Sequence, residues 1–327
     1  MLTLRLILFA LLTAAVWAQT GPILVDTDVG SDDIMAMAFL MAHPSVHIEA
    51  ITVANGTAHV DAGAQNVIRL LDVAGRTHIP VFMGRIGPLR GNAEFPAEWR
   101  KIADDLPGVK LPAPSHKPET QTAAQYLIQR LRHGPPVRIL ALGPLTNLGE
   151  ALQRDPQIAA NIAEIVIMGG AVRVPGNLGD GGVFHTDNTT AEWNIFVDPL
   201  AARIVFRSGV PVRLIPLDAT NRVPIGAAFL HAFEDGVRSP LGHTAAQVLA
   251  SDNEAITQGI FYAWDPLAAV ALLHPGVVKT VRLHIEIRQD APEAGRTAQS
   301  AGAPNAEVAL DADGAAFRKL FLDAFAQ

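Results

Sequence analysis

Short apolar runs alternate along the chain with longer segments whose apolar residues recur at helical spacing. The short runs are apolar throughout, which favours strands buried on both faces of a sheet. The expected strands span residues 21–28, 47–56, 79–84, 137–147 with a loop at the end, 162–170 and 210–218. The expected helices span residues 32–44, 62–75, 122–134 and 200–209. This order predicts a Rossmann-like α/β fold, with a mostly parallel central sheet and helices on both faces.

The remaining segments fit one domain from residue 19 to residue 327. The stretch LPGVKLPAPSHKPE, residues 106–119, is rich in proline and is predicted to be an exposed loop of that domain. Residues 220–258 have helical character, and we expect them to form a mobile cover. Beyond Val278 we expect one strand and a final helix.

The first 18 residues, MLTLRLILFALLTAAVWA, carry one arginine and then an apolar stretch that ends in Val16, Trp17 and Ala18. This pattern is typical of a secretory signal peptide, so we expect cleavage after Ala18. The alternative is an uncleaved membrane anchor, for which the apolar stretch is short. We therefore expect a secreted or periplasmic protein, and the absence of cysteine is compatible with an oxidising compartment.

Composition excludes one class of partner. Of the 327 residues, 49% are apolar and 17% are charged, which is the balance of a folded globular chain. The net charge is -7, whereas proteins that bind a nucleic-acid polymer usually carry a basic face. A nucleic-acid polymer is therefore not expected as a partner.

Polar residues follow several predicted strands at the point where each strand ends. Four aspartates follow the first strand, Asn55 follows the second, Thr146 and Asn147 follow ILALGPL, and Met168 ends IAEIVIM. In a parallel sheet the carboxyl ends of the strands meet at one edge, where ligands bind. We expect these residues to converge there.

The four aspartates are Asp26, Asp28, Asp32 and Asp33 in ILVDTDVGSDDIMAMAFL, and three interpretations compete. A helix N-terminus would account only for the last two. A haloacid-dehalogenase-type phosphotransferase would use the Asp-x-Asp after the strand, but it also needs a downstream lysine and a second acidic pair that are not evident. A divalent-cation site, with calcium as the ion, uses all four, because calcium takes six to eight oxygen ligands.

Five motifs in order decide among these interpretations. The acidic loop resembles the Asp-x-Asp-x-Gly-x-Asp-Asp signature of the nucleoside hydrolases, the inosine-uridine hydrolase family. The resemblance continues in TVANG, GPLTN, IVIMGG with AEWNIFVDPLAARIVF, and WDPLAAV, and it extends from Ile23 to about Val270. It implies that this chain hydrolyses the N-glycosidic bond of ribonucleosides.

The resemblance implies a calcium site and a catalytic base. Asp28, Asp33 and Asp265 would bind the ion with their carboxylates, and Thr146 would add its backbone carbonyl. Asp26 would orient these ligands from behind. The ion would hold a water and the ribose diol, and Asp28 would take the proton of that water as it attacks the anomeric carbon.

The same resemblance implies ribose contacts from the residues in these motifs: Asp32, Asn55, Met168, Glu192, Trp193 and Asn194. Polar groups that bind hydroxyls reject sugars that lack them, so ribosides should be preferred to deoxyribosides. Many family members also carry an asparagine where this chain has Thr186, and a ribose contact from the neighbouring Asp187 or Asn188 is left open.

The tryptophans point to a purine. Many members place a histidine, the acid for the leaving base, where this chain has Trp264. The loop at residues 92–108 resembles that of the purine-specific inosine-adenosine-guanosine branch, in which two tryptophans sandwich the base. Trp264 and Trp99 match those two positions. No histidine is assigned as a replacement acid, although His185, His231 and His243 lie in stretches that could approach the base.

Two other functions stay open. One is a ribonucleoside hydrolase with broad or pyrimidine specificity. The other is an exported nucleoside-binding protein without activity, although such a protein would not need Asp28 as a base. By analogy with the family, we also expect a homodimer or homotetramer.

Overall fold

The computed structural model describes residues 21–326, so the predicted signal peptide lies outside the described residues. The strands are β1 (Ile23–Thr27), β2 (Ile48–Val53), β3 (Val81–Met83), β4 (Val137–Ala141), β5 (Ile162–Met168), β6 (Val212–Ile215), β7 (Val278–Ile287), β8 (Thr297–Ser300) and β9 (Ala306–Ala312). The helices before β5 are α2 (Ser31–Ala42), α3 (Val60–Val73), α4 (Ala97–Asp105), α5 (Ala123–His133) and α6 (Thr146–Arg154). The later helices are α7 (Trp193–Val197), α8 (Pro199–Arg207), α9 (Leu217–Thr220), α10 (Ala227–Gly236), α11 (Pro240–Ser251), α12 (Asn253–Gln258), α13 (Trp264–Leu273) and α14 (Gly314–Phe325). Short 3-10 turns are η1 (Pro156–Asn161), η2 (Asp180–Gly182) and η3 (Pro275–Val277).

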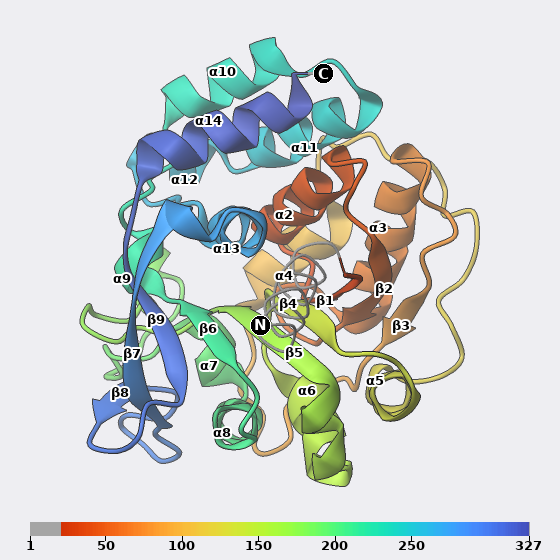
Figure 1. Ribbon diagram of the computed structural model, residues 1–327. Coiled ribbons are helices and arrows are strands. Elements are labelled where there is room, and N and C mark those ends of the chain that lie inside the picture. Colours follow the sequence, from red (N-terminus) through yellow and green to blue (C-terminus); the bar gives the residue numbers. More distant parts are fainter. Residues whose placement is uncertain (1–20, 327) are drawn as a thin grey trace, which may run out of the picture.

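The strands form one twisted sheet in the order β3-β2-β1-β4-β5-β6-β9-β7-β8 (Figure 1). Strands β1 to β6 pair in parallel, β9 continues this direction beside β6, and β7 runs antiparallel to β9 and β8. Every residue of β1 and β4 is buried, as the continuous apolar runs predict. The mostly parallel α/β fold predicted from the sequence is confirmed.

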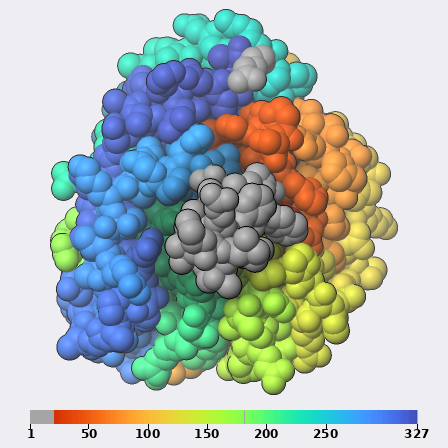
Figure 2. All heavy atoms as spheres, in the orientation of Figure 1, coloured from red at the N-terminus to blue at the C-terminus, as the bar shows by residue number. Residues whose placement is uncertain are grey.

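Helices cover both faces of the sheet and enclose a separate apolar core on each. Side chains of α2, α3, α10, α11, α13 and α14 share one core. Side chains of α5, α6 and α8 share the other. In Figure 1 the first group lies above the sheet and the second below it, and Figure 2 shows α10 and α14 at the upper end of the same face.

The sequence made two predictions for the C-terminal third: the number of strands beyond Val278 was wrong, and the helical character of residues 220–258 was right. Residues 278–312 contain three strands, where the sequence predicted one, and the final helix α14 follows as expected. The extra strands were missed because residues 279–282 in the first half of β7 are exposed and half of its residues are polar, and because β8 is only four residues long. The helical character of residues 220–258 is confirmed by α10, α11 and α12; the mobility of this segment stays a prediction.

The loop predicted at residues 92–108 contains a helix, α4. The sequence did not indicate this helix because the segment is polar on average, only Arg100 and Ala103 are buried, and Pro96 and Pro107 flank it. The proline-rich loop that follows, residues 106–119, lacks helices and strands and is mostly exposed, as predicted. Among residues 21–326, no helix is both long and apolar enough to cross a bilayer.

Candidate active site

The acidic residues lie on the turn from β1 into α2. Asp26 lies within the buried strand β1, and Asp28 follows the strand. Val29 has a left-handed backbone with φ of 63°, which is rare for a branched residue and marks a constrained turn. The turn brings Asp32 and Asp33 into the first turn of α2, where the positive end of the helix dipole favours negative charge.

Asp33 holds this turn together from inside. Its Oδ1 accepts hydrogen bonds from the hydroxyl of Thr27 and from the backbone N of Asp28, the latter at 3.2 Å. Its Oδ2 accepts one from the backbone N of Gly30 at 2.9 Å. Asp33 is 2% exposed, so the orientation of the neighbouring carboxylates depends on a buried network.

Asp28 is fixed by the loop after β2 and by two close glycines. Its Oδ2 accepts from the backbone N of Thr57 at 2.7 Å and from the hydroxyl of Thr57 at 3.1 Å. A Cβ at Gly56 would lie 2.0 Å from this Oδ2, and one at Gly143 would lie 2.7 Å from Oδ1. Only glycine at these two positions leaves room for the Asp28 carboxylate.

Asp265 joins the cluster from the first turn of α13, far along the chain. Asp32, Asp33 and Asp265 each place a carboxylate oxygen within 4.8 Å of the others. The Oδ1 atom of Asp265 is buried and has no hydrogen-bond partner within residues 21–326. A set of hard carboxylate oxygens with one of them unpartnered fits a divalent cation such as calcium or magnesium.

The electrostatics of the cluster support the same conclusion. Burial raises the pKa of the Asp28 carboxyl well above its ordinary value, and the charge of Asp33 raises it further. Burial and the charge of Asp33 do the same to the pKa of Asp32. For Asp265, burial raises the pKa most, followed by the charges of Asp32 and Asp33. A bound cation would remove the cost of this mutual repulsion.

Asp26 lies behind the cluster and contacts one residue of β2 and one residue in the first turn of α6. Its Oδ1 accepts from the hydroxyl of Thr52 at 2.5 Å and from Nδ2 of Asn147 at 2.8 Å. Burial raises the pKa of Asp26 to about 7, against the lowering effect of these two bonds. The role expected for Asp26 in orienting metal ligands stays a prediction.

The Thr146 side chain is turned away from the metal site. Its hydroxyl donates to Oδ2 of Asp198 at 2.9 Å, so only the backbone of Thr146 is left for the metal, as the resemblance implies. Asp198, which the sequence analysis did not select, is fully buried and also accepts from the backbone N atoms of Leu89 and Ala201. This carboxylate ties the loop after β3 to the start of α8.

The predicted ribose residues of the fifth strand and of AEWN come together. Both oxygens of Glu192 accept backbone N–H groups, from Gly170 at 2.8 Å, Asn194 at 2.9 Å and Ile195 at 3.3 Å. Nδ2 of Asn194 donates to the carbonyls of Leu142 at 2.7 Å and of Met168 at 3.3 Å. With its donors used, Asn194 retains its side-chain oxygen as an acceptor for a hydroxyl.

Asn55 has the opposite arrangement. Its Oδ1 accepts a hydrogen bond of 2.7 Å from Nη2 of Arg100, on α4. Sequence reasoning missed Arg100, because nothing in the local pattern brings residues 55 and 100 together. The only available signal was the position of Arg100 next to Trp99.

Trp99 and Trp193 lie in one aromatic cluster. Trp193 is buried, and its ring centroid lies 5.0 Å from that of Phe95 and 5.5 Å from that of Trp99. Phe184 and Phe196 complete the cluster. Trp99 is half-buried, so part of its ring faces outward.

Trp264 is half-buried in a different set of rings, with centroids 5.1 Å from Phe261 and 5.9 Å from Tyr262. It begins α13 directly beside Asp265, which places it at the edge of the acidic cluster. Trp99 and Trp264 thus lie far apart in the sequence and belong to separate aromatic groups. The base sandwich stays a prediction.

The residues left open in the sequence are displaced from the cluster or already engaged. Asn188 is buried, and it donates to the carbonyl of Ala294 at 2.8 Å while accepting from Thr190 and Ala191. Asp187 is exposed, and so are the three histidines considered as replacement acids: His185, His231 and His243.

One further carboxylate was missed. Asp252 stands between α11 and α12, and burial raises its pKa to about 6 while a hydrogen bond from Ser31 lowers it. Its charge also raises the pKa of Asp32. It therefore adds to the negative potential at the start of α2.

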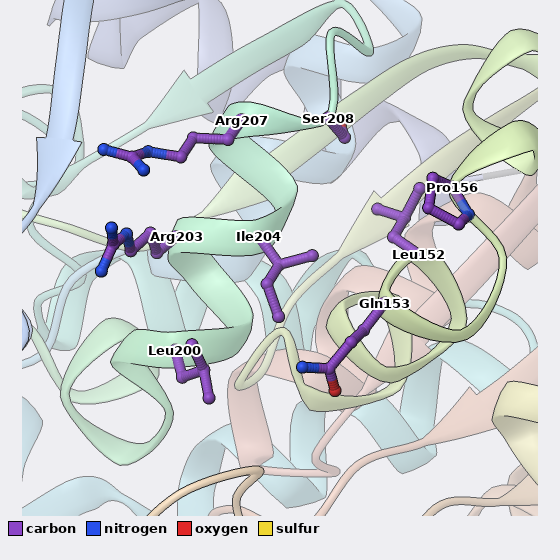
Figure 3. A pocket seen from close by; sticks show the side chains of 8 residues that line it. All are labelled: Leu152, Gln153, Pro156, Leu200, Arg203, Ile204, Arg207 and Ser208. Atoms are coloured by element: carbon purple, nitrogen blue, oxygen red, sulfur yellow. The ribbon is translucent and has the colours of Figure 1, made fainter.

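Two cavities can be compared with the positions of the candidate site residues. One, of about 410 Å³, is lined by Asn55, by the loop after β3, and by Glu94 and Glu150. The other, of about 390 Å³, lies between α6 and α8 and is lined by Leu152, Gln153, Pro156, Leu200, Arg203, Ile204, Arg207 and Ser208 (Figure 3). The first cavity adjoins a predicted site residue, whereas the second is lined entirely by other residues.

Comparison with known proteins gives a consistent result. The model of the inosine-uridine preferring nucleoside hydrolase family matches residues 23–319. The pyrimidine-specific ribonucleoside hydrolase RihA of Citrobacter koseri is 34% identical over 320 residues, covering 94% of this chain and 97% of the relative. RihA of Salmonella typhi is 34% identical over 318 residues with the same coverage.

Solved structures agree in fold. A plant nucleoside hydrolase, PpNRh1, is similar with a TM-score of 0.82 at 29% identity, covering 94% of this chain and 99% of that one. A purine-preferring ribonucleoside hydrolase from Gardnerella vaginalis has a TM-score of 0.82 at 26% identity, covering 93% and 98%.

Proposed function

This chain belongs to the inosine-uridine preferring nucleoside hydrolase family and is therefore an N-glycosyl hydrolase, and from that premise we propose that it is a calcium-dependent hydrolase of purine ribonucleosides. The products would be ribose and the free base. The observation that carries the proposal is the cluster of Asp32, Asp33 and Asp265 next to a constrained Asp28.

The acidic residues would hold the cation and the catalytic base. Asp28, Asp33, Asp265 and the Thr146 carbonyl are the proposed ligands. A calcium ion held there would acidify a water molecule and bind the ribose diol. Asp28 has one oxygen held by Thr57, and its other oxygen, next to Gly143, is the one we assign to proton removal.

The ribose would be recognised by complementary polar groups. Asn55 offers its amide donors, Asn194 offers its carbonyl oxygen, and Glu192 keeps lone pairs beyond those used by the backbone. Asp32 would bind a hydroxyl beside the cation, and Met168 and Trp193 would close the apolar side. As the glycosidic bond lengthens, positive charge develops on the ribose in an oxocarbenium-like transition state. The surrounding carboxylates would stabilise that charge.

The purine preference rests on the tryptophans. Trp264 adjoins the acidic cluster, and Trp99 lies on the aromatic cluster centred on Trp193. Each ring is half-buried and able to stack on a base. Stacking contributes roughly 1–3 kcal/mol per base, and a purine has the larger ring face.

Pyrimidine ribonucleosides are the second candidate. The observation in their favour is that two bacterial relatives at 34% identity are named pyrimidine-specific. A smaller base would be held by Trp264 alone, without a need for both rings.

Ribose release by the mature protein from inosine, guanosine, adenosine, uridine and cytidine would test both candidates, with calcium and with a chelator. Purine cleavage that stops on chelation supports the proposal. Faster cleavage of uridine and cytidine would replace it by the second candidate. Binding of inosine without cleavage would point instead to an exported binding protein.

We also propose export and self-association. Export rests on the signal-like residues 1–18, and N-terminal sequencing of the secreted protein should begin at Gln19. A homodimer or homotetramer is expected from the family, and light scattering would measure it.

A further inference from the structure

Arg100 is a charged side chain buried beside the proposed ribose site. It lies on α4 directly after Trp99, and it is only 4% exposed. Arginine is rarely buried to this extent without fixed partners, because the charge loses its hydration. The contacts of Arg100 therefore indicate what the residue does.

Its two terminal nitrogens bind two different segments. Nη1 pairs with Oε2 of Glu94 at 2.9 Å, and Nη2 donates to Oδ1 of Asn55 at 2.7 Å. The Glu94 carboxylate is largely exposed, whereas Asn55 is 5% exposed. Both partners line the same cavity of about 410 Å³. The guanidinium thus bridges the cavity wall from its solvent side to its buried side.

The bond to Asn55 has a direct chemical consequence. An asparagine side chain can present either its oxygen or its nitrogen, since the amide can turn over. A charged donor on Oδ1 fixes the oxygen toward Arg100 and leaves the two Nδ2 hydrogens facing away. Within residues 21–326 the two Nδ2 hydrogens of Asn55 make no hydrogen bond, so they are available to a ligand.

Arg100 also connects Asn55 to the helix that carries Trp99. The far end of α4 is held independently, because Nδ2 of Asn66 donates to the carbonyls of Ala103 at 3.1 Å and Asp104 at 3.0 Å. The helix is therefore already attached to α3 without Arg100. Attachment of α4 therefore does not by itself explain why Arg100 is buried against the side-chain amide of Asn55.

We propose that Arg100 is a positioning residue, which fixes the Asn55 amide so that it donates to a ribose hydroxyl. This inference rests on the proposed function and adds to it a residue outside the metal and ribose sets. It predicts that loss of Arg100 weakens recognition of one hydroxyl and leaves the metal site intact.

The test compares Arg100→Met, Asn55→Ala and the double variant. Steady-state kinetics would use inosine and its 2′-deoxy, 3′-deoxy and 5′-deoxy analogues. We expect Arg100→Met to lower kcat/KM for inosine about tenfold, the effect of one well-placed hydrogen bond. The two single variants should lose discrimination against the same deoxy analogue, and the double variant should be no worse than Asn55→Ala.

Arg130→Met is the matched control. Arg130 is likewise an arginine paired with a carboxylate, that of Glu49, but it is half-buried and lies on α5, below the sheet. It should change thermal stability without changing discrimination between inosine and its deoxy analogues. If Arg100→Met does not fold, Arg100→Lys retains the charge and one donor, and it should show an intermediate loss of discrimination.

The outcomes separate the inference from the proposed function. Equal loss of activity on all four substrates, or additive losses in the double variant, would overturn the positioning role while leaving the hydrolase in place. A wild-type protein that cleaves none of the ribonucleosides would overturn the proposed function. In that case calorimetric titration with inosine decides the inference: weaker binding by Arg100→Met supports it, and equal or absent binding overturns it.

Discussion

Asp33 and Asp265 occupy the first turns of two neighbouring helices, α2 and α13, and bring carboxylate oxygens within 4.8 Å of each other. The two helices pack side by side above the sheet, so both positive dipole ends point at one place. Two helix ends offset only part of the repulsion among several buried carboxylates. A bound cation would supply the missing positive charge, and its removal should be measurable.

Asp265→Asn should have opposite effects on stability with and without calcium. In chelator the variant should melt above the wild type, because one buried charge is gone. In calcium the wild type should gain about 2.7 kcal/mol at a concentration a hundred times the dissociation constant, and the variant should gain much less. Thermal unfolding in both buffers measures this. Asp311→Asn, at an exposed pair with Lys279, is the control, and an equal calcium shift in all three proteins would contradict the assignment.

Asp28→Ala should abolish most of the turnover and leave the fold unchanged. Loss of a general base alone lowers the rate by about 10² to 10⁴, and Asp28 is also a proposed ligand. Ribose release and circular dichroism are the two measurements. Asp72→Ala provides a control, since Asp72 accepts hydrogen bonds from Ser115 on the exposed surface. An active Asp28→Ala enzyme would remove this residue from the mechanism.

Gly56→Ala should impair catalysis without touching a reactive group. The added Cβ would lie 2.0 Å from Oδ2 of Asp28, so the carboxylate must move. A displacement on the order of 1 Å in an active site costs about a hundredfold in rate. Gly276→Ala is the matched control, because its Cβ would meet nothing within 4 Å. Similar kinetics for the two alanine variants would show that the position of Asp28 is not critical.

Trp264→Ala should lower kcat/KM for inosine far more than for uridine. A lost stack of roughly 1–3 kcal/mol corresponds to a decrease of about 5- to 150-fold. Trp264→Phe keeps a smaller aromatic face and should fall between. The same substrates with Trp99→Ala test the other ring. Equal losses on purine and pyrimidine substrates would refute the stacking role.

The fold was predictable where burial leaves a periodic signal. β1 and β4 are buried at every residue, so their apolar runs identify them directly. Helix α4 escaped detection because it buries a charged residue and one alanine. Strand β7 was missed because most of its first half is exposed.

For the candidate site, the sequence indicated only residues that lie in short motifs. Asp28 and Asp33 lie in one turn, and Glu192 and Asp265 each lie in a short, uninterrupted sequence motif. The contacts that hold the site are not local in sequence: Thr57 reaches Asp28 over 29 residues, Arg100 reaches Asn55 over 45, and Asn147 reaches Asp26 over 121. Such pairs depend on how the strands are ordered in the sheet, which no local pattern encodes.

The position of β9 between β6 and β7 affects how the protein folds during its synthesis. The N-terminal strands leave the ribosome first. One edge of β6 stays unpaired until β9, near the C-terminus, has been synthesised. A message truncated after Leu273 would still encode every proposed metal, ribose and base contact. Its product would nevertheless expose the open edge of β6, so we expect it to aggregate before it could catalyse anything.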